Sequence, residues 1–385
     1  MRLFIVYFLI LLILLGCQKI NAPRFLETGV PEMQPLTVMT YNVDIGSAAD
    51  ELMSVENLLD VPVEVAKVYN NVMASDFPGR AMAIAKSIKT YHPHLIGLQE
   101  ISLIRRQSPG DAIIGGTVPA ASVILDYLQI VMDALKAEGL NYRIAASVEN
   151  TDIELPMFTD AGLDDVRLTD YDVILARGDV EISRPIGENY ANTFTLEMPA
   201  LKLPGNAAIE GATALGVTYR TVDGHLEASI EVLRGYAAVD ATVSGITYRI
   251  VNTHLEAFDS NIRVAQAQEL VDRLREERLP ILLLGDFNSA APDGTSYQLL
   301  QAAGYVDLWQ ADSEGTGKTC CQDDDVKNEV SDLSRRVDII FLRNLQFPGD
   351  VLTHTVGDKP SDRSASGRWA SDHAGVVAQI TTPEP

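Results

Sequence analysis

Asp286 and Asn288 follow a short apolar run in the segment ILLLGDFNSA, which spans residues 281–290. Residues two apart on an extended chain point to the same side, so this carboxylate and carboxamide would face one pocket. A buried strand that ends in this way can present both groups to a ligand beyond its carboxyl end. Asp, Asn and Gly are also ordinary turn residues, so the segment alone predicts a site and a turn equally well.

The same pattern recurs near the ends of other predicted strands. The polar residues there are Asn42 and Asp44 in TYNVDIG, Glu100 in GLQE, His254 in NTHLEA, Asp338 in RRVDIIF, and Asp372 and His373 in SDHAGVV. Each has an ordinary structural explanation, such as a capped turn, a hydrogen-bonded core histidine or a salt bridge. Few basic residues accompany them, however, so carboxylates gathered at one edge would repel one another unless a divalent cation lay among them. Oxygen ligands favour Mg²⁺, Mn²⁺ or Ca²⁺ over Zn²⁺.

The elements that must position these residues are strands with helices between them. Alternation and apolar runs predict strands at 36–43, 95–98, 171–177, 236–257 (a hairpin turning at 244–245), 281–288, 335–343 and 371–380. Helical periodicity with stop signals predicts helices after residue 79, at 122–139 and at 261–280. Three stretches are predicted to be loops or insertions: 45–78, 108–120 and 191–227. This order predicts an α/β sandwich in one domain.

The composition suits an ordinary globular protein. The chain has 385 residues, of which 46% are hydrophobic and 22% charged. Its formal net charge of −23, without a long Lys/Arg run, disfavours tight non-specific binding to nucleic acid. A bound cation could still bring a phosphate to the site, and we expect a monomer.

The first residues, MRLFIVYFLILLILLGCQ, combine one basic residue with an apolar run too short for a comfortable membrane span. The run ends in Leu-Leu-Gly-Cys, which resembles a bacterial lipobox. We therefore predict a signal peptide at 1–16, lipidation of Cys17, a tether at 17–35 and a folded domain at 36–382. The protein would be exported and held at a cell-envelope membrane, facing the periplasm or the exterior. An uncleaved anchor and an ordinary signal peptide are the alternatives.

Two further cysteines are adjacent, at Cys320 and Cys321. No C-x-x-C spacing accompanies them, so the sequence does not predict a zinc site. Adjacent cysteines can form a vicinal disulfide, and a redox or structural role is open in an exported protein. The simplest expectation is a pair of loop thiols without a part in catalysis.

Six motifs taken in chain order resemble the endonuclease/exonuclease/phosphatase superfamily: TYNVD, GLQE, NTHLEA, LLGDFN, RRVDIIF and SDH. Each motif is weak alone, but together they cover residues 36–380. The resemblance implies a four-layer α/β sandwich, in which two packed mixed sheets carry helices on their outer faces. It also implies metal-dependent hydrolysis of a phosphoester.

The resemblance assigns roles by position. Glu100 would be the principal metal ligand for Mg²⁺ or Mn²⁺, helped by Asn42, Asp44 and Asp372. Asp286 would orient or deprotonate the attacking water, and Asn288 and His373 would contact the phosphate. Asp338 would hold the tautomer of His373. His254 would protonate the leaving oxygen. A general acid at His254 would matter far more for an alkoxide leaving group than for an aryl one.

Two departures from the family pattern bear on these expectations. His94 stands where the family more often has Asp, which we expect to affect local structure and not chemistry. The Trp-Cys-Asp-Arg run of inositol phosphatases is absent around Asp338, which lowers the case for inositol polyphosphates. Phosphodiester hydrolysis is the leading prediction. Phosphomonoester hydrolysis, or ligand binding without catalysis on the same fold, are the alternatives.

Overall fold

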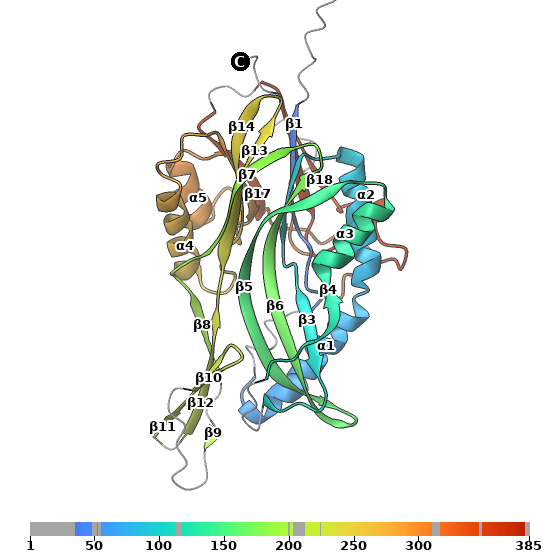
Figure 1. Ribbon diagram of the computed structural model, residues 1–385, viewed down its shortest axis with the longest axis vertical. Helices are drawn as coiled ribbons and strands as arrows, with labels where there is room; N and C mark the ends of the chain where they lie inside the picture. Colours follow the sequence, from blue (N-terminus) through green and yellow to red (C-terminus); the bar gives the residue numbers. More distant parts are fainter. Residues whose placement is uncertain are drawn as a thin grey trace, which may run out of the picture. The chain divides into compact units, whose positions relative to one another are not determined.

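Two mixed β-sheets pack face to face, and helices cover their outer surfaces (Figure 1). The computed structural model of the chain describes residues 35–381, apart from 48–51, 53–54, 113–117, 199–200, 203–211, 224, 310–315 and 346–348. The predicted signal peptide, Cys17 and nearly all of the predicted tether lie outside the described residues. These segments and the domain boundaries therefore remain predictions.

The first sheet has eight strands in the order β18-β19-β1-β2-β6-β3-β4, with β5 paired to β6. Its strands are β1 (Leu36–Asn42), β2 (Leu95–Gln99), β3 (Leu103–Gln107), β4 (Ser122–Asp126), β5 (Tyr142–Thr159), β6 (Gly162–Arg177), β18 (Val351–Val356) and β19 (Gly375–Ile380). β1 and β2 are parallel, and Asn42 pairs with Gln99 at their carboxyl ends. Asn42 and Glu100 therefore leave the sheet at the same edge.

The second sheet has six strands in the order β16-β17-β15-β14-β13-β7. Its strands are β7 (Glu181–Asn189), β13 (Gly235–Val243), β14 (Ile246–His254), β15 (Ile281–Asp286), β16 (Val306–Asp307) and β17 (Asp338–Arg343). The predicted hairpin turn is confirmed, because Ser244 and Gly245 both have positive φ between β13 and β14. Apolar side chains from the two sheets interlock into one buried cluster, which includes Val38, Ile174, Val239, Leu282 and Ile340.

Helices cover both outer faces (Figure 1). They are α1 (Val61–Ala74), α2 (Phe77–Tyr91), α3 (Tyr127–Ala137), α4 (Ser260–Arg273) and α5 (Thr295–Ala302), with short 3₁₀ turns η2 (Leu58–Asp60) and η4 (Pro360–Asp362). α2 and α3 pack on the first sheet, while α4 and α5 pack on the second. Within the part of the chain that is described, no helix is both long and apolar enough to cross a membrane. The predicted four-layer α/β sandwich is confirmed.

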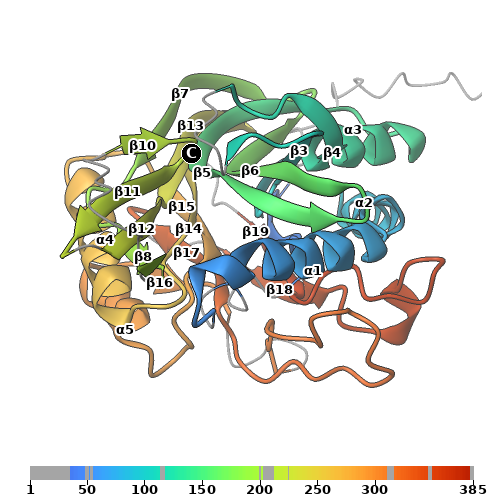
Figure 2. The same cartoon turned by 90° about the horizontal axis from the view of Figure 1, so that it is seen from below.

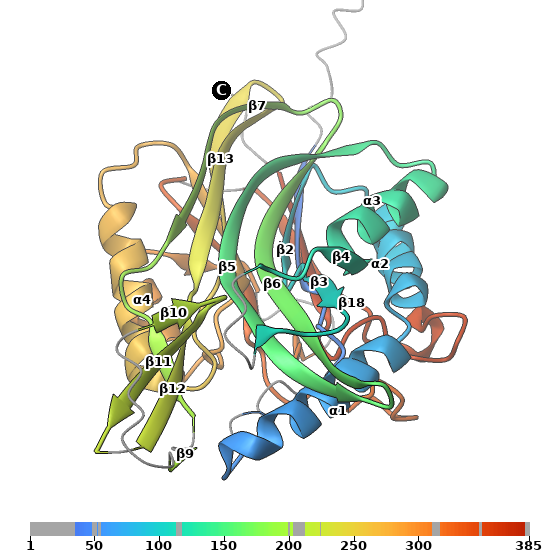
Figure 3. The same ribbon diagram turned by 60° about the horizontal axis from the view of Figure 1, so that its bottom comes forward.

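A third, smaller sheet lies mainly within 191–227, which was predicted to be a loop or an insertion; the stretch is an insertion with strands of its own. Its strands are β8 (Phe194–Glu197), β9 (Leu201–Lys202), β10 (Ala212–Ala214), β11 (Val217–Val222) and β12 (His225–Val232). Figure 3 shows β10, β11 and β12 side by side. Val217 and Ile230 of this sheet join Val65 of α1 and Leu155 of β5 in an apolar cluster. Most strands of this sheet are too short to show a pattern, but β12 does alternate, with apolar Leu226, Ala228, Ile230 and Val232 between polar residues.

Two other predictions concern segments that contain helices. The stretch 45–78, predicted to be a loop or an insertion, contains α1, which runs alongside β5 and β6 (Figure 2). α1 is rich in valine, a poor helix former, and is held by packing of Val61, Val65 and Val72. The helix predicted from residue 122 begins at Tyr127, since Asp126 caps α3 by accepting from the backbone N–H of Gln129. The five residues before it form β4.

Candidate active site

Three predicted site residues lie in one row across the second sheet. His254 at the end of β14 pairs with Asp286 at the end of β15, and Asp286 pairs with Asp338 at the start of β17. Gly285 makes this row possible, because a Cβ there would lie 2.0 Å from the carbonyl oxygen of Thr253. The glycine in GDFN therefore allows close strand approach directly before the carboxylate.

Asn42 connects the edges of the two sheets. Its amide nitrogen donates to Oε1 of Glu100 at 2.9 Å and to Oδ2 of Asp286 at 3.2 Å. Its side-chain amide oxygen, Oδ1, accepts from the backbone N–H of Asp44 at 3.0 Å. In this arrangement Asn42 orients two carboxylates through its nitrogen. Its predicted role as an oxygen ligand of a metal is not tested.

His373 and Asp338 form the closest ion pair of the site. Nδ1 of His373 lies 2.7 Å from Oδ2 of Asp338, and both side chains are buried. Burial opposes a charged imidazole, but the carboxylates of Asp338, Asp372 and Asp286 outweigh it and hold the pKa of His373 well above its usual value. Nε2 of His373 lies 3.8 Å from Oδ2 of Asp286. His373 is therefore a fixed cation with one nitrogen turned toward Asp286.

Asp286 stays ionised in this setting. Burial works against its charge, yet the imidazolium of His373, together with hydrogen bonds from Asn288 and Asn42, holds its pKa below the usual value. The backbone N–H of Asn288 donates to Oδ1 of Asp286 at 2.9 Å. An ionised carboxylate held by donors on both oxygens can orient a water molecule. Asp338 behaves differently, because burial and the charge of Asp286 raise its pKa to about 6.

His254 is buried between two hydrogen-bond donors. A guanidinium nitrogen of Arg234 lies 3.0 Å from its Nδ1, and the amide nitrogen of Asn288 lies 3.0 Å from its Nε2. Burial and the charge of Arg234 lower the pKa of His254 to about 4. Both ring nitrogens of an imidazolium carry a proton, so neither could accept a hydrogen bond from Arg234 or Asn288. His254 is therefore neutral at physiological pH, which argues against the predicted general-acid role.

Asn288 joins the same group but uses its amide nitrogen within the protein. That nitrogen also donates to the carbonyl oxygen of Leu255 at 3.0 Å. Asn288 has a φ of 47°, in the left-handed region, and Glu100 across the site has a φ of 59°. Backbone held in this region by surrounding structure is typical of functional sites. Asn288 thus lies beside His254 and Asp286 but in a turn, because β15 ends at Asp286 and the chain is not extended to residue 288 as the i, i+2 argument assumed.

Glu100, Asp372 and Asp44 form the carboxylate-rich side of the site. Among the described residues Glu100 has no basic partner, and it accepts from Asn42 and from the backbone N–H of Ile45. Burial and the charge of Glu100 raise the pKa of Asp372 to about 6 against the opposing effect of His373. Burial and Asp372 raise that of Asp44 to about 8. This mutual repulsion and all-oxygen donor set fit a hard divalent cation.

Asp44 has a competing partner that the sequence did not reveal. Fully buried Arg80 of α2 lies 3.3 Å from Oδ2 of Asp44, and Oδ1 accepts from the backbone N–H of Gly46. The same guanidinium donates to the carbonyl oxygens of Val43 and Ala370. Arg80 thereby ties together two loops that carry site residues. A role for Asp44 as a metal ligand stays a prediction, with its carboxylate already engaged.

A second group of close ligand atoms consists of Asp286, Asp338 and His373. Their ligand atoms lie within 4.8 Å of one another. The 2.7 Å contact between His373 and Asp338 already satisfies this group internally. The assignment of the cation to Glu100 and Asp372 stays a prediction, since neither residue belongs to the groups of close ligand atoms among the described residues.

Arg234 and two acidic residues of β6 were missed by sequence analysis. Arg234 lies 3.9 Å from Asp170, whose other neighbour is the amide nitrogen of Asn150 at 3.1 Å. Asp172 is fully buried, and burial with the charge of Asp170 raises its pKa well above the usual value. These residues come from elements without a recognisable motif, so no spacing signal could have found them.

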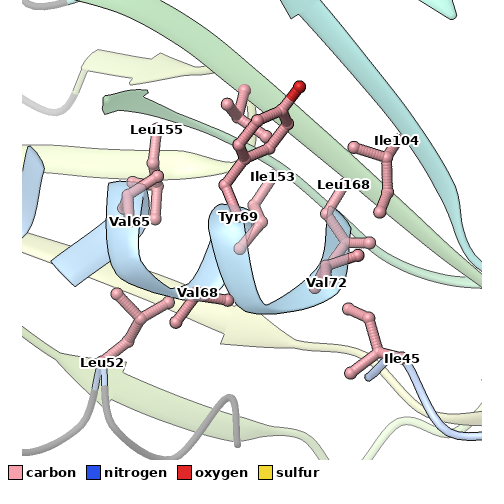
Figure 4. A pocket seen from close by; sticks show the side chains of 11 residues that line it. Ile45, Leu52, Val65, Val68, Tyr69, Val72, Ile104, Ile153, Leu155 and Leu168 are labelled. Carbon is pink, nitrogen blue, oxygen red and sulfur yellow. The ribbon is translucent and has the colours of Figure 1, made fainter. Parts of the chain in front are cut away.

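An apolar pocket of about 70 Å³ lies between α1 and the first sheet (Figure 4). Val65, Tyr69 and Val72 of α1 face Ile104 and Leu168 across it. Its lining is almost wholly apolar, so it offers no group for the chemistry described above. The pocket reflects the loose fit of a valine-rich helix against long strands.

The fold and site define a DNase-I-like α/β sandwich with an acidic, histidine-containing centre at the strand ends. A model of the endonuclease/exonuclease/phosphatase family matches residues 39–373. The chain belongs to this family, which confirms the resemblance of the six motifs. Members of the superfamily are hydrolytic phosphoesterases, and they typically use divalent metals.

Solved structures support the fold. A family protein from Leptotrichia buccalis has 13% identity and a TM-score of 0.50, over 90% of this chain and 99% of that one. A mannosyl-6-phosphatase from Bacteroides thetaiotaomicron has 16% identity and a TM-score of 0.50, over 90% and 99%. Another family protein from Bacteroides thetaiotaomicron has 18% identity and a TM-score of 0.50, over 91% and 100%. No curated protein matches the sequence.

Proposed function

We propose that this protein is a metal-dependent phosphoesterase that hydrolyses phosphodiester bonds. The observation that carries the proposal is the arrangement of His373, Asp338 and Asp286 at the ends of facing strands. A cationic imidazole, fixed by one carboxylate, lies 3.8 Å from a second carboxylate that stays ionised. Such a pair can hold an anionic phosphoryl group beside an oriented water molecule.

The roles of the side chains follow from their contacts. Nε2 of His373 would donate to a phosphoryl oxygen and neutralise charge that develops during attack. Asp286 would accept a hydrogen bond from the attacking water and direct its lone pair at phosphorus. Asn42 donates hydrogen bonds to both Asp286 and Glu100, and so fixes the position of one carboxylate relative to the other. His254, as a neutral imidazole, would direct its one N–H at Asp286, whose Oδ2 lies 3.5 Å from Nε2.

Glu100 and Asp372 are the residues that would hold the cation, which we propose to be Mg²⁺ or Mn²⁺. When bound, a divalent cation polarises the phosphoryl group and stabilises negative charge. The charge of Glu100 helps to raise the pKa of Asp372, and Asp372 helps to raise that of Asp44, so the cation would also relieve this repulsion.

Charge favours a diester over a monoester as substrate. A phosphodiester carries one negative charge, whereas a monoester carries up to two near neutral pH. His373 is the one imidazolium of the site among the described residues, and several carboxylates surround it. The mannosyl-6-phosphatase of similar fold keeps a monoester as the second candidate. Export and lipid anchoring are also part of the proposal, and they rest on the N-terminal sequence.

The test is a hydrolysis assay of the purified protein. Diesters with nucleotide, phospholipid and small alkyl groups are compared with matching monoesters, with Mg²⁺ or Mn²⁺ and after exhaustive EDTA treatment. We expect diester cleavage that requires the cation, and His373→Ala should lower kcat by about 10²- to 10³-fold. Full activity after EDTA, or a strong preference for monoesters, would contradict the proposal.

Glu100→Gln tests the metal assignment separately. The substitution removes one anionic ligand, so the Mg²⁺ concentration for half-maximal activity should rise at least about tenfold. Glu138→Gln is the matched control, because Glu138 lies at the end of α3 and pairs with Lys89. Metal activation curves that coincide for the two variants would show that Glu100 is not a ligand.

A further inference from the structure

Cys320 and Cys321, predicted to be loop thiols, lie outside the helices and strands and next to the candidate site. They are joined by a disulfide. Cys320 forms backbone bridges both with Arg335, just before β17, and with His373. The backbone N–H of Gln322 donates to the carbonyl oxygen of Asp372 at 2.8 Å. The cysteine pair is thus fastened between the two segments that carry Asp338 and His373.

The sulfur atoms face the reactive side of the histidine. Sγ of Cys321 lies 3.9 Å from Nε2 of His373, the nitrogen that Asp338 does not occupy. The guanidinium of Arg335 lies 3.2 Å from the sulfur of Cys320 and 3.6 Å from that of Cys321. Hydrolysis as proposed above needs no sulfur, so this placement is left unexplained by it.

We propose that reduction of this disulfide creates a second, soft metal site formed by Cys320, Cys321 and Nε2 of His373. The ligand atoms of these three residues lie within 4.8 Å of one another. Two thiolates and an imidazole are ligands that Zn²⁺ and Cd²⁺ prefer, whereas Mg²⁺ and Mn²⁺ prefer the oxygens of Glu100 and Asp372. The two sites therefore select different cations a short distance apart.

The chemistry balances with a thiol or phosphine reductant from outside the protein. The reductant supplies two electrons, the sulfur–sulfur bond breaks, and each sulfur takes one proton. When the cation binds, both thiols and Nε2 of His373 release their protons to solvent, and two metal–sulfur bonds and one metal–nitrogen bond form. Arg335 favours this step because a nearby cation stabilises thiolates. The disulfide form offers no thiolate, so the site exists only in the reduced protein.

Occupation of this site would remove His373 from catalysis. An Nε2 bound to a metal cannot donate to a phosphoryl oxygen. Reduced protein would therefore lose turnover when a thiophilic cation is present, while oxidised protein would keep it. The binding site stands independently of the proposed function, and only the loss of turnover rests on it.

The binding test needs no enzyme assay. Full-length protein with Cys17→Ser retains Cys320 and Cys321 as its only cysteines. It is reduced with a phosphine, freed of reductant without air, and titrated with Cd²⁺ alone. We expect a thiolate-to-cadmium charge-transfer band that saturates at one ion per chain in the reduced form and is absent from the oxidised form. Cys320→Ser/Cys321→Ser is the matched control and should lack the band.

Three outcomes would overturn the proposal. They are a missing band in the reduced protein, a band of equal size in oxidised protein, and a band retained by the double serine variant. Reduced protein that loses its near-ultraviolet circular dichroism before cation is added would also overturn it, because the ligands would no longer be assembled. His373→Ala should weaken cadmium binding in the reduced form. Unchanged affinity in that variant would remove the histidine from the site.

The functional consequence is measured afterwards with Zn²⁺ in the presence of saturating Mg²⁺. Zinc should abolish diester hydrolysis by the reduced protein and leave the oxidised protein and the double serine variant active. Cadmium binding without any hydrolysis in either form would support the sulfur site and contradict the proposed function. Hydrolysis without cadmium binding would support the proposed function and contradict the sulfur site.

Discussion

His254 is enclosed by Arg234 on one ring nitrogen and Asn288 on the other, and both neighbours offer hydrogen-bond donors. A general acid must carry a proton that it can give up easily, which for histidine means the imidazolium. With a pKa near 4, His254 holds that form in less than about 1% of molecules at pH 7. Its remaining N–H can donate a hydrogen bond but is too weak an acid to release its proton.

This leads to a prediction for substrates with different leaving groups. His254→Ala should lower kcat/KM about a hundredfold or more for an alkyl diester and for an aryl diester alike, because a lost donor affects both. A general acid would instead matter mainly for the alkyl substrate, whose alkoxide needs a proton. Parallel rate measurements on the two diesters decide between the roles. A much greater loss on the alkyl diester would restore the role expected from the sequence.

Side chains on consecutive strand ends were predictable, whereas their partners from elsewhere were not. The Asp-x-Asn spacing placed Asp286 and Asn288 together, and the motif order placed His373 near Asp338. Arg80 and Arg234 change the charge of Asp44 and His254, but they reach the site from a helix face and from the start of a hairpin. Their effect depends on three-dimensional proximity, which no local spacing encodes. The same reason explains why the sequence did not reveal that Cys320 and Cys321 lie next to His373.

At the scale of elements, the start of β2 shows that a residue which departs from the family pattern, His94, can still make the structural contact of that position. His94 precedes the strand, and its Nδ1 accepts the backbone N–H of Thr37 at 3.0 Å. Its own backbone N–H donates to the carbonyl oxygen of Thr37 at 2.7 Å. An aspartate, which the family more often has here, could accept the same hydrogen bond. This supports the expectation that His94 affects local structure and leaves the chemistry alone.

His94 should therefore make stability depend on pH. Burial and nearby Arg177 lower its pKa to about 4 in the folded protein, against about 6.5 when unfolded. Below pH 6.5 the unfolded chain takes up a proton that the folded one refuses, so this stabilisation is complete above 6.5 and disappears as pH falls toward 4. His94→Gln keeps an acceptor and does not titrate. Relative to it, wild type should lose up to about 3 kcal/mol between pH 7.5 and 4 in urea unfolding. If wild type and His94→Gln lose equal free energies of unfolding over this pH range, His94 is not responsible.

Elements with strong patterns were predicted well, and elements held by tertiary contacts were not. β15 and α4 have apolar runs or helical periodicity, and both appear where expected. α1 contains many valines and a proline, so its local preference opposes a helix until it packs against β5. β4 has three exposed residues and exists because it pairs with β3. Local propensity cannot reveal such partners.

For the whole molecule, charge limits how it can reach a membrane. The net charge of −23 repels anionic lipid head groups, so no electrostatic attraction would hold the chain at a bilayer surface. No spanning helix occurs among the described residues. We propose that attachment comes from the N-terminal segment, either through lipid on Cys17 or through the apolar run at 3–15.

Replacing Cys17 with Ser distinguishes these two possibilities. Lipid chains give stable anchoring through burial of their methylene groups, so wild type should stay in the membrane fraction and resist washing with high salt. Cys17→Ser cannot be acylated, and it should retain its unprocessed signal segment or appear in the soluble fraction. Metabolic labelling with a fatty acid separates these results. Wild type should incorporate label and Cys17→Ser should incorporate none. Cys320→Ser/Cys321→Ser is the control and should label like wild type. Equal labelling of Cys17→Ser and wild type would exclude Cys17 as the lipidation site. Absence of label from a membrane-bound wild type would leave the uncleaved apolar run as the anchor.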